Sequence, residues 1–106
     1  MTNGGVSSPT DPIHVLQSSG DELLGVVEEA SNAGTYVAAH LYTDAAIARA
    51  VECGVRAVEH ANLIEPPTAR LMRDKSAIAC PTLVAYEALH DEGAARVRSK
   101  SCTRQV

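Results

Sequence analysis

The chain has 106 residues, a length that fits one small domain or a piece of a larger one. Its formal net charge of -4 argues against nucleic acid as a general partner, and no apolar run is long enough to span a membrane. Three cysteines without close spacing do not form a disulfide framework, so we expect a reduced, cytoplasmic setting. With no Trp, no Phe and 3 Tyr, the core has to consist mainly of Ala, Val, Leu and Ile.

The first third of the chain predicts a long loop, a helix and a short strand. Residues 1–20 are rich in Gly, Ser and Pro, and so long an irregular segment in a compact domain is usually either functional or wrongly assigned as a loop. From Asp21 to about Asn32, apolar residues recur at spacings of three and four, which predicts a helix that ends at Gly34. The apolar stretch Tyr36–Ala39 then predicts a buried strand.

The next part of the sequence alternates between helix and strand. Thr43 is a candidate N-cap for a helix that ends at Gly54, and a second buried strand covers about Arg56–Glu59. The two prolines that begin the segment 66–75 are tolerated in the first turn of a helix. A third strand follows over Ala77–Cys80.

A last helix begins near Ala85, and the order of elements indicates the fold class. The three strands start about 20 residues apart, and short apolar strands joined by helices indicate a parallel sheet with helical crossovers. The chain is therefore predicted to be α/β. Two architectures fit, an open doubly wound sheet and a section of a (β/α)8 barrel, of which a complete example needs about 250 residues.

Two histidines are the main candidates for chemistry. His40 and His60 each end an apolar strand, and functional groups of parallel α/β folds gather at the carboxyl ends of the strands. Neutral imidazole is a common zinc ligand, but a catalytic zinc site usually takes three protein ligands and a water. From position alone, a histidine at a strand end is more often a hydrogen-bonded polar residue or a substrate contact than a metal ligand.

The other reactive side chains have simpler interpretations. His90 lies in a polar stretch and is expected to be solvated. Cys53 and Cys80 stand among apolar residues, where a free cysteine is usually inert and buried. Glu59 precedes His60, and regular alternation along a strand would point the two side chains to opposite faces.

Three stretches of the sequence resemble the amidohydrolase superfamily, in its imidazolonepropionase-like and prolidase-like branch. They are GGVSSPTDPI, AGTYVAAHLYTDAAIARAVECGVRAVEHANLIEPPTARLM and ACPTLVAYEAL. The resemblance covers residues 1–93 and implies a partial (β/α)8 TIM barrel, with strands that correspond to the end of the fourth and to the fifth, sixth and seventh. Residues 94–106, which end in the basic sequence RVRSKSCTRQV, do not resemble the family.

The resemblance also implies a site. His40 corresponds to a metal ligand on the fifth strand and His60 to one on the sixth, for a divalent metal that is often zinc. Tyr42 corresponds to a position that can contact the carboxylate of the substrate. The implied reaction is hydrolysis of a C–N bond in a small molecule such as a dipeptide, an acylated amino acid or a cyclic amide.

The sequence also departs from the family pattern. It has no HxH motif, no lysine before the Gly4–Gly5 pair and no aspartate that corresponds to the one on the eighth strand, and Ala61 stands where many relatives have glycine. We therefore expect the isolated chain to have little or no hydrolase activity. The alternative is a non-catalytic α/β module that binds a ligand or associates with itself, because a partial barrel leaves strand edges unpaired and favours a homo-oligomer.

Overall fold

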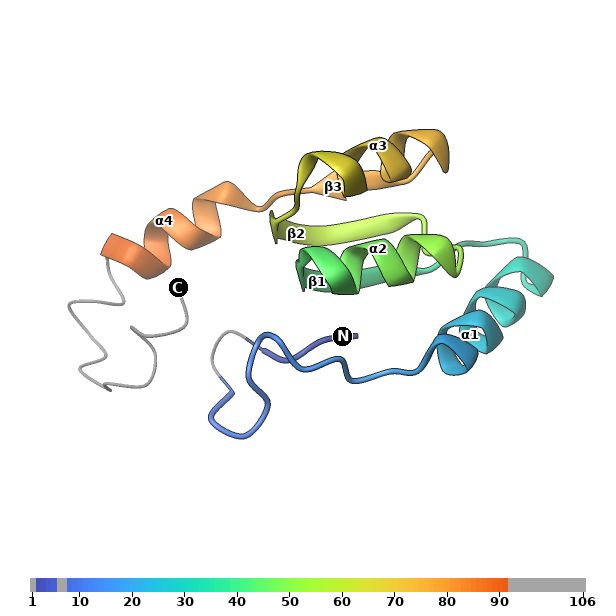
Figure 1. Ribbon diagram of the computed structural model, residues 1–106, viewed down its shortest axis with the longest axis horizontal. Coiled ribbons are helices and arrows are strands. Elements are labelled where there is room, and N and C mark those ends of the chain that lie inside the picture. Colours follow the sequence, from blue (N-terminus) through green and yellow to red (C-terminus); the bar gives the residue numbers. More distant parts are fainter. Residues whose placement is uncertain (1, 6–7, 92–106) are drawn as a thin grey trace.

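The computed structural model describes residues 2–5 and 8–91, and within them the strands form one parallel sheet (Figure 1). Its three strands are β1 (Ala38–Thr43), β2 (Ala57–Leu63) and β3 (Ile78–Cys80), in the order β1-β2-β3. Both pairings are parallel, which confirms the predicted sheet type. Residues 94–106, predicted to be a separate basic tail, lie outside the described residues.

Four helices are present in the described part of the chain, and none of them is long and apolar enough to cross a membrane. They are α1 (Gly20–Asn32), α2 (Asp44–Glu52), α3 (Pro66–Asp74) and α4 (Leu83–Asp91). The predicted bounds of the helices agree with these to within about two residues. Thr43 is the N-cap of α2 as predicted, although its side chain makes no capping hydrogen bond.

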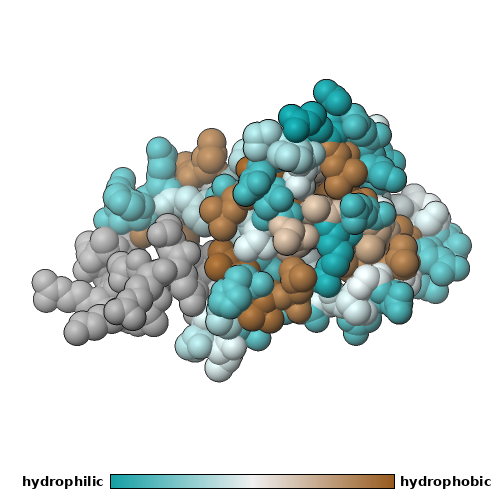
Figure 2. All heavy atoms as spheres, viewed as in Figure 1, coloured by the Kyte–Doolittle hydropathy of each residue, from teal (hydrophilic) through white to brown (hydrophobic). Residues whose placement is uncertain are grey.

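The core lies between the sheet and the helices α2 and α3. Alternate strand residues such as Ala39, Leu41 and Val58 are buried on this side, and Ile47 and Val51 of α2 pack against them. The cluster is built from Ala, Val, Leu, Ile and Met, as the composition predicts. Figure 2 shows apolar side chains among polar ones on the outer surface of this helical layer.

The opposite face of the sheet carries the row His40, Glu59 and Cys80, which are partners in the register of the three strands. Because partners in a sheet point to the same side and neighbours along a strand alternate, this row faces away from the buried Ala39 and Val58. Cys80 is exposed, so its predicted burial is wrong. Within the described residues, the core lies on the other face of the sheet, so Cys80 is not part of it.

Helices α1 and α3 end in the same hydrogen-bonded turn. In α1, Gly34 has a φ of 71° and the next amide, that of Thr35, donates to the carbonyl of Ala30 at 2.9 Å. In α3, Ser76 occupies the equivalent position with a φ of 55°, and the amide of Ala77 donates to Met72 at 2.8 Å. Glycine is the residue that adopts this left-handed conformation without strain, and Ser76 adopts it with a side chain.

The segment that precedes α1 is tied to the edge of β1. Asn3 is fully buried, its amide nitrogen donates to the carbonyl of Ile13 at 2.7 Å, and its oxygen accepts from the amide of Tyr42 at 3.3 Å. At Gly4 a Cβ atom would lie 1.9 Å from the carbonyl oxygen of Pro12, so a side chain does not fit there. The predicted long loop is therefore packed on the same end of the sheet as the two histidines.

Candidate functional site

The two candidate histidines are in direct contact. Nδ1 of His40 lies 2.8 Å from Nε2 of His60, and the ring centroids are 5.0 Å apart. Both residues lie inside strands, because β1 continues to Thr43 and β2 to Leu63; the prediction that the strands end before the histidines was wrong in this respect. The structure nevertheless brings the two side chains together toward the carboxyl ends of β1 and β2.

The contact depends on an irregular backbone at His60. The register of the sheet pairs His60 with Leu41, and it shifts between Leu41 and Thr43. In a regular strand His60 would point to the buried side with Leu41. His60 instead has a φ of 79° and Ala61 a φ of 51°, which turns the imidazole toward His40. Residues other than glycine rarely adopt such angles, and those that do cluster at functional sites.

Aromatic rings and a hydroxyl surround the imidazole of His60. Tyr42 stacks on it with ring centroids 4.8 Å apart and an interplanar angle of 8°, and Tyr86 of α4 meets it edge-on at 5.8 Å and 86°. Thr82, which directly precedes α4, places its hydroxyl 2.7 Å from Nδ1 of His60. Tyr42 is 8% exposed, so its ring packs in the site beside the histidine pair.

The surroundings favour uncharged forms of the central side chains. Burial is the main cause that lowers the pKa of His60; the neighbouring His40 lowers it further, and the carboxylate of Glu59 opposes the shift. Burial also raises the pKa of Tyr86 to about 12, with further contributions from the charge of Tyr42 and a hydrogen bond to it. His60 therefore tends to stay neutral near pH 7, the form in which imidazole binds a metal.

A shared metal would fix the distance between the two facing ring nitrogens. Two imidazole nitrogens bound to one tetrahedral zinc at 2.0–2.1 Å are about 3.3 Å apart. The observed 2.8 Å between Nδ1 of His40 and Nε2 of His60 therefore has to widen by about half an ångström. In the segments 2–5 and 8–91, no group of three or more His, Cys, Asp or Glu side chains is arranged to hold a metal. The spacing of the two ring nitrogens is thus compatible with a shared metal, and the described residues supply no third ligand beside them.

Comparison with known proteins identifies the barrel to which this geometry belongs. A solved prolidase complexed with N-methylphosphonate-L-proline is 50% identical, with a TM-score of 0.90 over 99% of this chain and 26% of its own. A solved amidohydrolase is 53% identical, with a TM-score of 0.89 over 96% of this chain and 25% of its own. The chain belongs to the amidohydrolase family. The predicted fold, a partial TIM barrel with parallel strands, is thereby confirmed.

The curated relatives of this amidohydrolase chain point the same way. Ochratoxinase from Aspergillus niger is 33% identical over 82 residues, which are 77% of this chain and 17% of the ochratoxinase. No protein-family model matches the chain. The chain therefore spans about a quarter of the length of the solved relatives and less than a fifth of the curated ones.

Thr82 and Tyr86 were not among the candidates from the amidohydrolase-like sequence, and neither was Asn3. Thr82 and Tyr86 come just after β3, at the carboxyl end of the third strand. In a parallel sheet this end lies beside the carboxyl ends of β1 and β2, and that position was the signal that could have identified the two residues. Asn3 gave no such signal, because its role depends on contacts with residues 10 and 39 positions away. His90 is exposed and paired with Asp91, as its polar surroundings predict.

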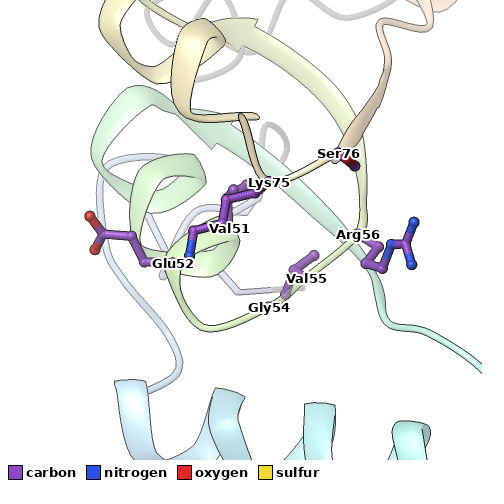
Figure 3. Close-up of a pocket in the computed structure, with 7 residues that line it drawn as sticks. All are labelled: Val51, Glu52, Gly54, Val55, Arg56, Lys75 and Ser76. Carbon is purple, nitrogen blue, oxygen red and sulfur yellow. The ribbon is translucent and has the colours of Figure 1, made fainter. Parts of the chain in front are cut away.

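A separate hollow of about 430 Å³ lies at the other end of the amidohydrolase sheet (Figure 3). Arg56 and Ser76, which line it, come just before β2 and β3, whereas the histidines lie toward the carboxyl ends of their strands. Figure 3 shows the side chains of Glu52 and Arg56 pointing in opposite directions. The hollow therefore contributes nothing to the histidine site.

Proposed function

We propose that this chain contributes two ligands, His40 and His60, to the divalent metal site of a hydrolase that cleaves C–N bonds. The contact of 2.8 Å between their ring nitrogens carries the proposal, together with membership of the amidohydrolase family. The metal in this proposal is zinc, because imidazole nitrogens are among its usual ligands. When bound, such a metal activates water and polarises the scissile carbonyl.

The substrate class in this proposal is a dipeptide or an N-acylated amino acid. One solved relative is a prolidase bound to N-methylphosphonate-L-proline, and another, 26% identical with a TM-score of 0.80, is a Xaa-Pro dipeptidase. The proposed contact to the carboxylate of such a substrate is Tyr42, whose ring stacks on His60. Tyr86, whose pKa is raised to about 12, stays protonated beside it and is able to donate a hydrogen bond.

The isolated chain is expected to be inactive or weakly active. A catalytic zinc usually takes three protein ligands, and the described residues bring two together. Hydrolysis of a panel of proline dipeptides and N-acyl amino acids by the purified, zinc-loaded chain tests this point. Turnover by the wild type that disappears in His40→Ala would show that two ligands suffice and would overturn the expected inactivity.

A zinc titration by calorimetry tests the ligands themselves. We expect His40→Ala and His60→Ala each to lower the affinity at least 10-fold. The matched control is His90→Ala, because His90 is exposed on α4 and pairs with Asp91. Equal zinc affinity of the wild type and the two site variants would contradict the proposed metal site, as would a loss of equal size in the control.

A second candidate, a self-associating module, is favoured by β3. All three residues of β3 are exposed, and Ile78 on this edge strand is 67% exposed. An exposed strand edge pairs readily with another chain, and a homo-oligomer would cover it. Light scattering over a range of concentrations, with Ile78→Lys as the variant, tests the proposal. A wild type that stays monomeric at the highest concentration would contradict it.

A further inference from the structure

Thr82 is hydrogen-bonded to His60, and it lies outside the two strands that carry the histidines. Its hydroxyl oxygen lies 2.7 Å from Nδ1 of His60, and the contact joins β2 to the segment between β3 and α4. Thr82 is half-buried and has a φ of 45°, a left-handed conformation that a β-branched residue rarely adopts. A conformation of this kind persists where the surrounding contacts hold it in place.

Each ring nitrogen of His60 has one hydrogen-bond partner among the described residues. Tyr42 stacks on one face of the ring, and Tyr86 meets the ring in a T-shaped arrangement. An imidazole forms its hydrogen bonds through the two ring nitrogens, Nδ1 and Nε2. Nδ1 faces Thr82 and Nε2 faces His40. A neutral imidazole carries one N–H, so a proton on Nδ1 leaves Nε2 with a lone pair.

We propose that Thr82 is a positioning residue, which accepts the Nδ1–H of His60 and thereby directs the lone pair on Nε2 toward His40. In this arrangement the proton between the two rings belongs to His40, whose Nδ1–H donates to Nε2 of His60. The inference deepens the proposed function, on which its consequence for metal binding rests, because the second hydrogen bond of a ligating histidine fixes its tautomer and orientation.

The contact also links two left-handed residues. His60 and Thr82 have φ values of 79° and 45°, and each side chain is a hydrogen-bond partner of the other. The Thr82 hydroxyl is the one hydrogen-bond partner of Nδ1 of His60 among the described residues. The tautomer of His60 is therefore the property that reports directly on Thr82.

The test uses the full chain, free of metal, and ¹⁵N NMR of the histidine rings. Thr82→Val keeps the shape and the branching of the side chain and removes the hydroxyl, whereas Thr82→Ser keeps the hydroxyl. We expect the Nδ1–H tautomer of His60 in the wild type and in Thr82→Ser, and a mixture of both tautomers in Thr82→Val. Thr35→Val, at an exposed threonine after α1, is the matched control and should leave the tautomer unchanged.

The metal provides a second readout. We expect Thr82→Val to weaken zinc binding about 10-fold and Thr82→Ser to stay near the wild type, in line with the usual effect of losing the partner of a ligating histidine. A wild type with the Nε2–H tautomer would overturn the inference, and so would a Thr82→Val variant with an unchanged tautomer. If Thr82→Val does not fold, the tautomers of the wild type and of Thr82→Ser still decide between these outcomes.

The two proposals fail in different ways. If the chain binds no zinc but Thr82→Val changes the tautomer, the metal site fails while the positioning role of Thr82 stands. If zinc binds through His40 and His60 and the tautomer does not depend on Thr82, the metal site stands and the positioning role is wrong.

Discussion

His60 contacts His40 although the register of the sheet pairs it with Leu41. The left-handed backbone at His60 turns its ring out of the alternation of β2, into the space bounded by Tyr42 and Tyr86. The ring is partly withdrawn from water there, and burial lowers its pKa. Because the pKa of His60 differs between the folded and the unfolded chain, the free energy of unfolding depends on pH in a predictable direction.

Replacing His60 should make the free energy of unfolding fall less steeply as the pH is lowered below 6.5. Because the folded pKa of His60 lies below the ordinary 6.5, the unfolded chain binds the proton first as the pH falls. The stabilisation is therefore present above pH 6.5 and is lost as the pH falls from 6.5 toward the folded pKa. Urea unfolding of the wild type and of His60→Gln at several pH values measures the difference in slope.

The control for this measurement is His14→Gln, because His14 is exposed and lies in the opening segment, outside the site. We expect the control to keep the slope of the wild type. A His60→Gln variant with an unchanged slope would show that the ring of His60 is not withdrawn from water as described.

Tyr86 should have the opposite effect at alkaline pH. Its pKa is raised from 10.0 to about 12, so between these values the unfolded chain has lost the phenolic proton and the folded chain has kept it. The contribution of Tyr86 to stability is present below pH 10 and is lost as the pH rises toward 12. Tyr86→Phe should remove this dependence.

The ultraviolet absorbance of tyrosinate measures the same ionisation directly. The difference between the wild type and Tyr86→Phe should titrate near pH 12, and Tyr36→Phe, at an exposed ring, serves as the comparison. A difference that titrates near pH 10 would mean that Tyr86 is not held against Tyr42 and His60.

Ser76→Gly should stabilise the chain. Ser76 is exposed and holds the left-handed position after α3, where Gly34 stands after α1. Relief of the strained φ should increase the free energy of unfolding by about 0.5–1 kcal/mol, because glycine adopts this conformation without steric cost. The reverse change, Gly34→Ala, should reduce it by about 1 kcal/mol at a position where a Cβ atom meets no neighbour within 4 Å.

Chemical unfolding of the two variants separates backbone strain from packing. A Ser76→Gly variant that is less stable than the wild type would show that the hydroxyl makes a contribution larger than the strain. A neutral Gly34→Ala would show that the turn after α1 relaxes without a left-handed residue.

The sequence predicts the elements of this fold well where local signals are strong. The helix Gly20–Asn32 has a periodic apolar face and Gly34 after it, so its end was predictable. The strands β1 and β2 extend further at their carboxyl ends than predicted, because the prediction ended each strand before its polar histidine, whereas the ladder continues beyond it to Thr43 and Leu63. Hydrogen bonding between strands does not depend on the apolar side chains on which that prediction rested.

The site divides in the same way. The sequence predicted that His40 and His60 end neighbouring parallel strands, and from this topology their side chains were expected to converge. The left-handed angle at His60 was not predictable, since it is held by contacts with Tyr42 and with Thr82, which lies 22 residues later in the chain. The residues near His60 in the sequence do not indicate which side chain 22 residues later contacts it.

Asn3 should be the most sensitive position in the opening segment. Its side chain is fully buried and satisfies two backbone groups, the carbonyl of Ile13 and the amide of Tyr42. Asn3→Ala leaves both groups buried without a partner and should lower the free energy of unfolding by about 2–4 kcal/mol. Asn62→Ala, at an exposed asparagine of β2, should change it by less than about 0.5 kcal/mol.

Asn3→Asp separates the two hydrogen bonds of Asn3. A carboxylate still accepts from the amide of Tyr42 but has no N–H for the carbonyl of Ile13, so it places two acceptors against each other. We expect Asn3→Asp to be at least as destabilising as Asn3→Ala, while hydrogen exchange at the amide of Tyr42 stays slower than in Asn3→Ala. If both variants unfold like the wild type, the opening segment is not anchored to β1 through Asn3, and Tyr42 owes its place beside His60 to the ring stack alone.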